Sequence, residues 1–210
     1  MHQLTDLPDE VARIPEHLAA NSRRARPPSG AQPPYEFATG PRATPSPRAR
    51  PRANGYPQLV HTLHTIGYQG TTVADFLDAL EAVGVELLVD VRAVAASRRP
   101  GFAKSALAAN LEARKIDYRH LRSVGTPAEG RAKARAGDHA GMRAIFLEHL
   151  TTDGAQAGLN ELEALIRLGR PICIMCFEDD PTHCHRSIVA EALQARMPLR
   201  VEHLRPEHAG

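Results

Sequence analysis

The fold is decided by one stretch of sequence, Pro171-Ile-Cys-Ile-Met-Cys-Phe-Glu-Asp-Asp-Pro-Thr-His-Cys-His-Arg-Ser187. Its first part, Ile172 to Phe177, is a short apolar run of strand-forming residues that ends at a polar turn. A helix is predicted from Thr182 or His183 to about Arg196, because apolar residues recur along one face of it. Ligands of open α/β sheets bind at such connections, outside the carboxyl ends of the strands. We therefore expect the functional site here.

Strand-like and helix-like segments alternate on both sides of this stretch. The alternation implies right-handed βαβ units and a mostly parallel sheet with helices on both faces, which is a single three-layer α/β domain. Residues 123–137 show no periodic pattern and are predicted to be irregular. The predicted strands lie at about 59–67, 85–91, 116–121, 172–177 and 201–204, and the other predicted helices at about 71–84, 104–115, 139–150 and 159–168.

Residues 1–57 differ in composition from the rest of the chain. Most of the 17 prolines lie here. Between Ala20 and Tyr56 there are several arginines but a single acidic residue, Glu36. Such a segment buries too little apolar surface to offset the entropy of ordering it. We predict a disordered, Pro/Arg-rich tail over 1–57 and the α/β domain over 58–210. The arginines of the tail either bind a polyanion weakly or belong to a solvated linker.

Composition excludes several classes of protein. The net charge of +2 is too small to indicate a class of binding partner. The low aromatic content of 4% and the absence of Trp argue against a surface that binds single-stranded nucleic acid by base stacking. Three cysteines are an odd count, which fits a reducing cytosol better than a secreted disulfide framework. No apolar run approaches the roughly 20 residues of a membrane span, and no secretory signal is recognised. The expected location is cytoplasmic, without membrane association.

Polar residues follow several of the predicted strands. In a parallel sheet the carboxyl ends of the strands share one edge, so these side chains are expected to gather there. Their convergence depends on the predicted fold. The residues concerned are Tyr68, Asp90, Arg92, His120, Cys176 and Glu178.

Six motifs occur in order along the chain: Thr65-Ile-Gly-Tyr68, Leu88-Val-Asp-Val-Arg92, Ser97-Arg-Arg-Pro-Gly-Phe102, Tyr118-Arg-His-Leu121, Gly125-Thr-Pro127 and Cys176-Phe-Glu-Asp-Asp-Pro-Thr-His-Cys-His-Arg186. Together they resemble the domain of unknown function 488 family, over roughly 63–193. The resemblance implies a compact α/β domain and no particular activity. The chain departs from the family pattern at Ala95 and Ala96, where relatives usually have Pro and a larger apolar residue.

Cys184 is the first candidate for a reactive group. It falls at the start of a predicted helix, beside His183, His185 and Arg186. A helix N-terminus and nearby cations favour the thiolate, which is a nucleophile. The alternative is a small buried residue at a helix end. Cys176 closes an apolar strand, where it is either part of the core or the partner of Cys184 in a reversible disulfide.

A metal site is not expected from this sequence. Cys176, His183, Cys184 and His185 are of the types that bind zinc. However, consecutive residues are expected to point in different directions, and no second Cys/His pair has ligand spacing. The sequence contains neither a Gly-x-Gly-x-x-Gly nor a Walker loop, so a dinucleotide or P-loop site is not predicted. The sequence leaves the cofactor unknown.

Anion binding is indicated by the placement of several arginines. Arg186 lies in the first turn of a predicted helix, where free backbone N–H groups already favour phosphate. Arg92 ends a buried strand, where it either binds a ligand or pairs with Asp90 or Glu178. Arg98 adds positive charge in a Gly/Pro loop or is simply solvated.

Two carboxylates complete the predicted site. Asp90 and Glu178 end neighbouring strands if the second and fourth strands are adjacent. They would then serve as general acid and base, hold Mg²⁺ against a phosphate, or form salt bridges with Arg92 and Arg186.

The sequence thus favours an enzyme that acts on a phosphate-bearing ligand, a nucleotide or nucleic acid, at the carboxyl edge of the sheet. One alternative is a non-catalytic module that binds nucleotides or nucleic acid, and another is a thiol- or metal-based redox sensor. Neither the substrate nor the oligomeric state is predicted. The catalytic candidates are Cys184, Glu178, Asp90 and His185, and the ligand-binding candidates are Arg92, Arg186, Arg98, Tyr68, His120 and Cys176.

Overall fold

The computed structural model of the protein describes residues 60–206, and the predicted tail lies outside this part. The described chain forms one five-stranded sheet in the order β3-β2-β4-β1-β5. Every pair of neighbouring strands is parallel, so the predicted three-layer α/β class is confirmed. The strands are β1 (His61–Gly67), β2 (Leu87–Asp90), β3 (Asp117–His120), β4 (Ile172–Cys176) and β5 (Leu199–Leu204).

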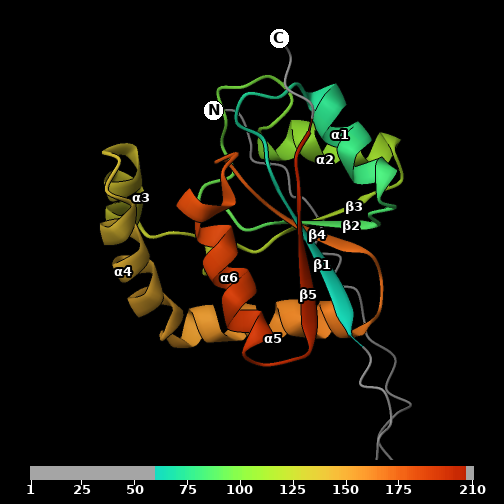
Figure 1. Cartoon of the computed structure of the whole chain (residues 1–210). Helices are drawn as coiled ribbons and strands as arrows, with labels where there is room; N and C mark the ends of the chain where they lie inside the picture. The colour runs from blue at the N-terminus through green and yellow to red at the C-terminus, as the bar shows by residue number, and fades with distance from the viewer. Residues whose placement is uncertain (1–59, 207–210) are drawn as a thin grey trace, which may run out of the picture. The chain divides into compact units, whose positions relative to one another are not determined.

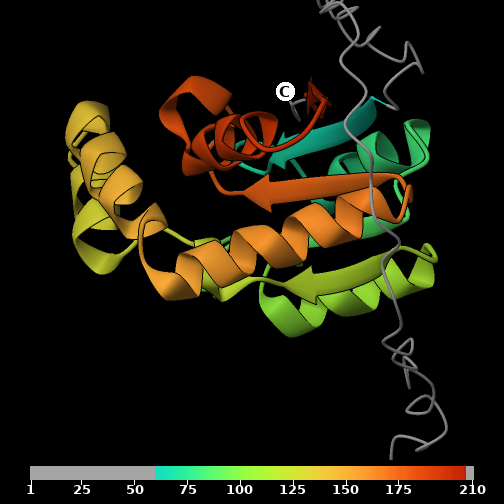
Figure 2. The same cartoon turned by 90° about the horizontal axis from the view of Figure 1, so that it is seen from below.

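Helices cover both faces of the sheet. Figure 1 shows α1 and α2 on one face and α5 and α6 on the other, while α3 and α4 lie apart from the sheet. In Figure 2 the strand arrows point toward α3 and α4, so these two helices stand beyond the carboxyl ends of the strands. The helices are α1 (Val73–Ala82), α2 (Lys104–Ala113), α3 (Ala128–Arg135), α4 (His139–Leu150), α5 (Asp153–Arg167) and α6 (His185–Gln194).

The alternation of side chains along β4 assigns each cysteine of the strand to one face. Ile172, Ile174 and Cys176 belong to the apolar cluster formed with α4, α5 and α6. Cys173 and Met175 belong to the cluster formed with α1 and α2. Because successive residues of a strand point to opposite faces, Cys176 is directed toward the α6 side of the sheet.

The sheet has a switch point between β2 and β4. From β2 the chain continues through α2 to β3 at one side of the sheet, and from β4 it continues through α6 to β5 on the other side. The two connections diverge, which opens a crevice outside the carboxyl ends of these strands. The predicted adjacency of the second and fourth strands is confirmed, with Asp90 paired to Met175.

The residues that begin and end α1 are those expected from the sequence. Thr72 caps the helix because its side chain accepts a hydrogen bond of 3.1 Å from the backbone N–H of Asp75. The chain turns away at Gly84, whose φ of +68° is readily adopted only by glycine. Both features agree with the sequence prediction.

Two helices differ from the prediction. The segment expected to be irregular contains α3, which the sequence analysis missed because it has no apolar stripe; Gly130 is its one buried residue. Its alanines and charged side chains are nevertheless good helix formers. Helix α5 begins at Asp153 rather than near 159, capped by Thr152. Its first turns bury only small residues, Ala155 and Gly158, which give a weak apolar signal.

The segment between β4 and α6 contains a short 3-10 helix, η2 (Pro181–His183), before α6 starts at His185. Cys184 separates the two in an extended conformation. The predicted helix start is therefore two or three residues too early. Within residues 60–206, no helix is both long enough and apolar enough to cross a bilayer.

Gly67 is required where β1 meets the loop that follows β4. A Cβ atom at this position would lie 1.9 Å from the carbonyl oxygen of Glu178. We expect Gly67→Ala to lower the free energy of unfolding by about 1–3 kcal/mol, because the loop must move to admit the methyl group. Urea unfolding followed by circular dichroism measures this change.

Gly154→Ala is the matched control, because nothing lies within 4 Å of its added Cβ and it sits in the first turn of α5. That variant should be unchanged or stabilised by about 0.4–1 kcal/mol. Equal stabilities for the two variants would contradict the close approach of β1 to the loop.

Candidate functional site

A cavity of about 910 Å³ opens at the carboxyl edge of the sheet. Its walls come from the segment after β2, the segment after β4, the start of α6, and helices α3 and α4. Four of the predicted site residues on the sheet side line it, namely Tyr68, Arg92, Cys176 and Glu178. His185 and Arg98 line it as well.

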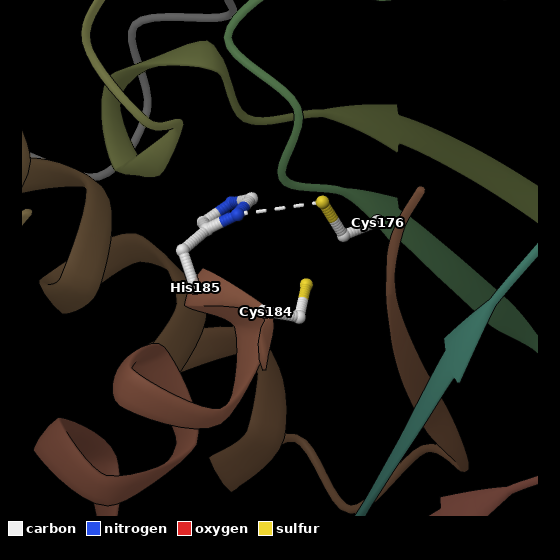
Figure 3. A group of neighbouring side chains, drawn as sticks. All are labelled: Cys176, Cys184 and His185. Atoms are coloured by element: carbon white, nitrogen blue, oxygen red, sulfur yellow. Dashed lines mark hydrogen bonds between the residues drawn. The ribbon is translucent and has the colours of Figure 1, made fainter. Parts of the chain in front are cut away.

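His185 bridges Cys176 and Val91, the residue that follows β2. The Cys176 sulfur lies 3.3 Å from Nδ1 of His185 (Figure 3). On the other side of the ring, Nε2 lies 2.9 Å from the carbonyl oxygen of Val91. Because a carbonyl oxygen only accepts, Nε2 carries a hydrogen, and the lone pair of a neutral His185 is on Nδ1. The ring edge that faces the sulfur is thus able to accept a proton or bind a metal.

Cys184 completes a compact group with these two residues. The sulfur atoms of Cys176 and Cys184 and one ring nitrogen of His185 all lie within 4.8 Å of one another, and all three residues are buried (Figure 3). Cys184 is the N-cap residue of α6 and makes no side-chain capping bond. It does not line the cavity, so of the two sulfurs only that of Cys176 is presented to a ligand.

The expectation that consecutive residues diverge is wrong for Cys184 and His185. Cys184 has the extended angles φ −118° and ψ 140°, whereas His185 is the first residue of the helix. This change of backbone conformation turns both side chains toward β4. The expectation does hold for His183, which is exposed and stacks on His139 with ring centroids 4.1 Å apart.

The pKa values of the two thiols are shifted in opposite directions. Burial raises the pKa of Cys176, and the neighbouring Cys184 and Glu178 raise it further. Burial opposes ionisation of Cys184 too, but hydrogen bonds with Cys176 and His185 lower its pKa well below the usual value. Burial lowers the pKa of His185, and the hydrogen bond and charge of Cys184 outweigh this and raise it. A negative charge on Cys184 is therefore stabilised beside the imidazole, while Cys176 favours the protonated thiol.

Glu178 lies at the entrance to this group. The Cys176 thiol donates a hydrogen bond of 3.3 Å to its Oε2. Burial, with the negative charge of Cys184 as the next cause, raises the pKa of Glu178 to about 7. A carboxyl group at this position is able to give or take a proton at the edge of the cavity.

Asp90 and Arg92 form a buried ion pair. Nη2 and Nε of Arg92 lie 2.6 Å and 2.9 Å from the two carboxylate oxygens of Asp90. Nη1 donates to the hydroxyl of Tyr68 at 2.8 Å, and Tyr118 donates to Asp90 at 2.7 Å. Burial lowers the pKa of Arg92, but its bonds to Asp90 raise it overall. The ion-pair interpretation therefore fits Arg92, and Asp90 is fully buried outside the cavity lining.

Arg186 also has a structural environment. Its guanidinium is fully buried and donates to the carbonyl oxygens of Glu178 and Asp179, and to the hydroxyl of Thr65 at 3.4 Å. It is not part of the cavity lining. The geometry therefore favours a role in holding the loop after β4 against β1, rather than the predicted role in anion binding.

Tyr68 and His120 support the site in different ways. Tyr68 lines the cavity and stacks on Phe102 with ring centroids 4.4 Å apart. His120 does not line it, and its Nε2 lies 2.9 Å from the carbonyl oxygen of Arg92. His120 therefore positions the chain that follows β2.

Basic residues from α3 and the segment after β2 form another wall of the cavity. Arg98, Arg131 and Arg135 line it, and none forms an ion pair with an acid of residues 60–206. Two further nitrogens on lining residues, Nε of Arg99 and Nδ1 of His139, are buried without a hydrogen-bond partner. Both atoms are therefore able to form a hydrogen bond with a water molecule or a ligand in the cavity.

Arg131, Arg135 and His139 were not among the site residues expected from the sequence. They lie in or next to α3, which was not predicted, and far along the chain from Cys176. The one signal was the run of bases in a segment between predicted elements. Only the placement of α3 beyond the sheet edge brings them to the cavity.

The fold and this site define a three-layer α/β protein with a Cys/His group at the edge of an all-parallel sheet. The family model described as "Domain of unknown function DUF488" matches residues 72–193, which is more than half of the chain. The chain belongs to this family, as its motifs predicted. No curated protein and no solved structure matches the chain.

The buried ion pair gives a test of the framework around the site. Arg92→Met leaves the Asp90 carboxylate buried without its cation, so we expect a loss of about 3–5 kcal/mol in the free energy of unfolding. Arg119→Met is the control, because Arg119 pairs with Glu161 at the surface. That change should cost less than about 1 kcal/mol. Denaturant unfolding of both variants measures the difference, and similar small losses would contradict a structural role for Arg92.

Proposed function

We propose that this protein is an enzyme that acts on a phosphate-bearing ligand, a nucleotide or nucleic acid, bound in the cavity at the carboxyl edge of the sheet. The observation that carries the proposal is the composition of the cavity walls. Proton-transfer and thiol groups line one part, and arginines without acidic partners among residues 60–206 line another.

The arginines are the main support for an anionic ligand. Arg98, Arg131 and Arg135 project positive charge into a concave site, where the low dielectric of the walls strengthens the potential. A guanidinium presents several N–H donors in a plane, which suits the oxygens of phosphate. The unsatisfied nitrogens of Arg99 and His139 would gain hydrogen bonds from the same ligand.

The size of the cavity supports a ligand larger than a free phosphate. A volume of about 910 Å³ falls near the upper end of the range of roughly 300–1,000 Å³ that is typical for small-molecule sites. It admits a nucleotide or the end of a nucleic-acid strand. In the absence of a Walker loop, arginine side chains rather than a glycine-rich loop would hold the phosphates.

The reactive groups lie next to this basic wall. Glu178 and His185 line the cavity and both contact the Cys176 sulfur, at 3.3 Å each. Of the two, Glu178 is placed to transfer protons to and from a bound ligand. We assign the ligand-facing thiol to Cys176 rather than to Cys184, because Cys184 lies behind the cavity wall. Asp90 acts as a positioning residue, through Arg92.

The basic wall predicts binding of a nucleotide by the full chain. ATP should raise the melting temperature, and the double variant Arg131→Ala/Arg135→Ala should lose most of that shift, because it loses two of the four cavity arginines (Arg98, Arg99, Arg131 and Arg135) that form no ion pair with an acid of residues 60–206. Differential scanning fluorimetry measures the shift. The tail arginines are present in every variant, so a difference between variants reports on the cavity.

Arg143→Ala is the control for this comparison. Arg143 is exposed on α4, pairs with Glu191 and does not line the cavity. Its ATP shift should equal that of the unsubstituted chain. The proposal is wrong if neither ATP nor a short single-stranded DNA raises the melting temperature, or if the double variant responds like the control.

Glu178→Gln separates an enzyme from a binding module. The substitution keeps the shape of the side chain and removes its acid–base function, so we expect an unchanged ATP shift and at least about a 100-fold loss of turnover. Turnover is measured by chromatography of nucleoside triphosphates and a labelled oligonucleotide after incubation with the protein. If the unsubstituted chain binds these probes and converts none of them, the non-catalytic module is the better description.

A further inference from the structure

We propose that Cys176, Cys184 and His185 bind a zinc ion whose fourth coordination position faces the cavity. The metal site stands on the geometry of these three residues and does not depend on the proposed function. The role of the zinc ion in hydrolysis does rest on the proposed function, and it specifies the class of reaction that the enzyme would catalyse.

The ligand atoms are already near coordination distance of one another. The two sulfurs and one ring nitrogen lie within 4.8 Å of each other, and the Cys176 sulfur is 3.3 Å from Nδ1 of His185. Tetrahedral zinc with Zn–S of about 2.3 Å and Zn–N of about 2.0 Å places its ligand atoms roughly 3.5–3.8 Å apart. Small side-chain rotations are therefore sufficient to close the site.

The orientation of the His185 ring is an independent observation. Its Nε2–H is held by the carbonyl oxygen of Val91 at 2.9 Å, which leaves the lone pair of Nδ1 directed at the two sulfurs. Histidine ligands of metals almost always donate their other N–H to a carbonyl or carboxylate in this way. The outer hydrogen bond of a metal-binding histidine is thus already in place.

Charge balance favours a divalent cation. Two thiolates this close in a buried place would repel each other strongly, and zinc between them removes that repulsion. Cys184 also occupies the N-cap position of α6, a helix of ten residues, so the helix dipole stabilises its thiolate. Two thiolates and a neutral imidazole make a soft ligand set, which suits zinc and not magnesium or calcium.

The exposure of the ligands indicates a catalytic type of site. Cys176 and His185 line the cavity whereas Cys184 lies behind them, so the open side of the triangle faces the ligand. Structural zinc sites are closed by four protein ligands, and catalytic sites have three and an open position. Glu178, whose Oε2 lies 3.3 Å from the Cys176 sulfur, stands beside that position.

This arrangement assigns hydrolysis as the reaction class. Glu178 takes a proton from a water molecule at the open position, and the water oxygen forms a bond to the electrophilic centre of the phosphate-bearing ligand. The bond from that centre to the leaving group breaks, and Glu178 returns the proton to the leaving group. The sum is the addition of one water molecule, without oxidation or reduction.

Metal content and a cobalt spectrum of the full chain test the site. Protein purified with reductant and without chelator should contain about one zinc ion per chain, measured by inductively coupled plasma mass spectrometry. Exchange for Co²⁺ should give a thiolate-to-cobalt charge-transfer band and the intense visible bands of tetrahedral coordination. The proposal is overturned if zinc added to the reduced, unsubstituted chain does not bind, or if Co²⁺ gives no thiolate band.

Single substitutions assign the ligands. Cys176→Ser and Cys184→Ser should each lose the charge-transfer intensity of one thiolate and most of the bound zinc. Cys173→Ser is the control, because Cys173 is buried in the same strand but on the opposite face of the sheet. Equal zinc content in all three variants would overturn the assignment. The cobalt spectrum of the unsubstituted chain decides the matter even if a variant fails to fold.

The same samples separate this inference from its alternatives. A Cys176–Cys184 disulfide that forms in air, together with no zinc binding after reduction, would overturn the metal site in favour of a thiol sensor. Zinc bound through the two cysteines without any ATP shift would support the metal site and contradict the proposed phosphate ligand. A rise in melting temperature with ATP in a chain that binds no zinc would support the phosphate ligand and overturn the metal site.

Discussion

The pairing of β2 with β4 is the constraint on which the site depends. It sets Asp90 beside Met175 and brings the chain that leaves β2 next to the chain that leaves β4. The His185 ring bridges the two by contacting Cys176 on one side and the Val91 carbonyl on the other. Without this pairing the cysteines would lie at the end of a strand with no second wall, and the cavity would not form.

Two buried arginines stabilise the framework of this edge. Arg92 is neutralised by Asp90, and Arg186 donates to the carbonyl oxygens of Glu178 and Asp179. A guanidinium out of water needs such partners, since its desolvation is costly. The residues that looked most like ligands of an anion in the sequence are therefore occupied within the protein. The cations that remain for a ligand belong to α3 and to the segment after β2.

Much of the site was predictable from the sequence, since Tyr68, Cys176, Glu178 and His185 each follow from a strand end or a helix start. What could not be predicted was the direction of individual side chains. Cys184 was the first candidate for a nucleophile, yet it is buried and does not line the cavity. Direction at a strand-to-helix junction depends on one pair of backbone angles, and no periodic pattern reports it.

The sequence by itself determined the α/β class and the strand that carries Cys176, because buried strands and amphipathic helices leave local apolar patterns. It also determined the family, through its ordered motifs. Only the tertiary structure decided which residues meet. Helix α3 shows no apolar stripe, since it stands beyond the sheet and buries little, and yet it supplies Arg131 and Arg135 to the cavity. Likewise, Cys184 and His185 converge on Cys176 because the chain changes conformation at the start of α6. The first contact arises from the packing of segments that are distant in the sequence and the second from a local change of backbone angles, and neither leaves a periodic pattern in the sequence.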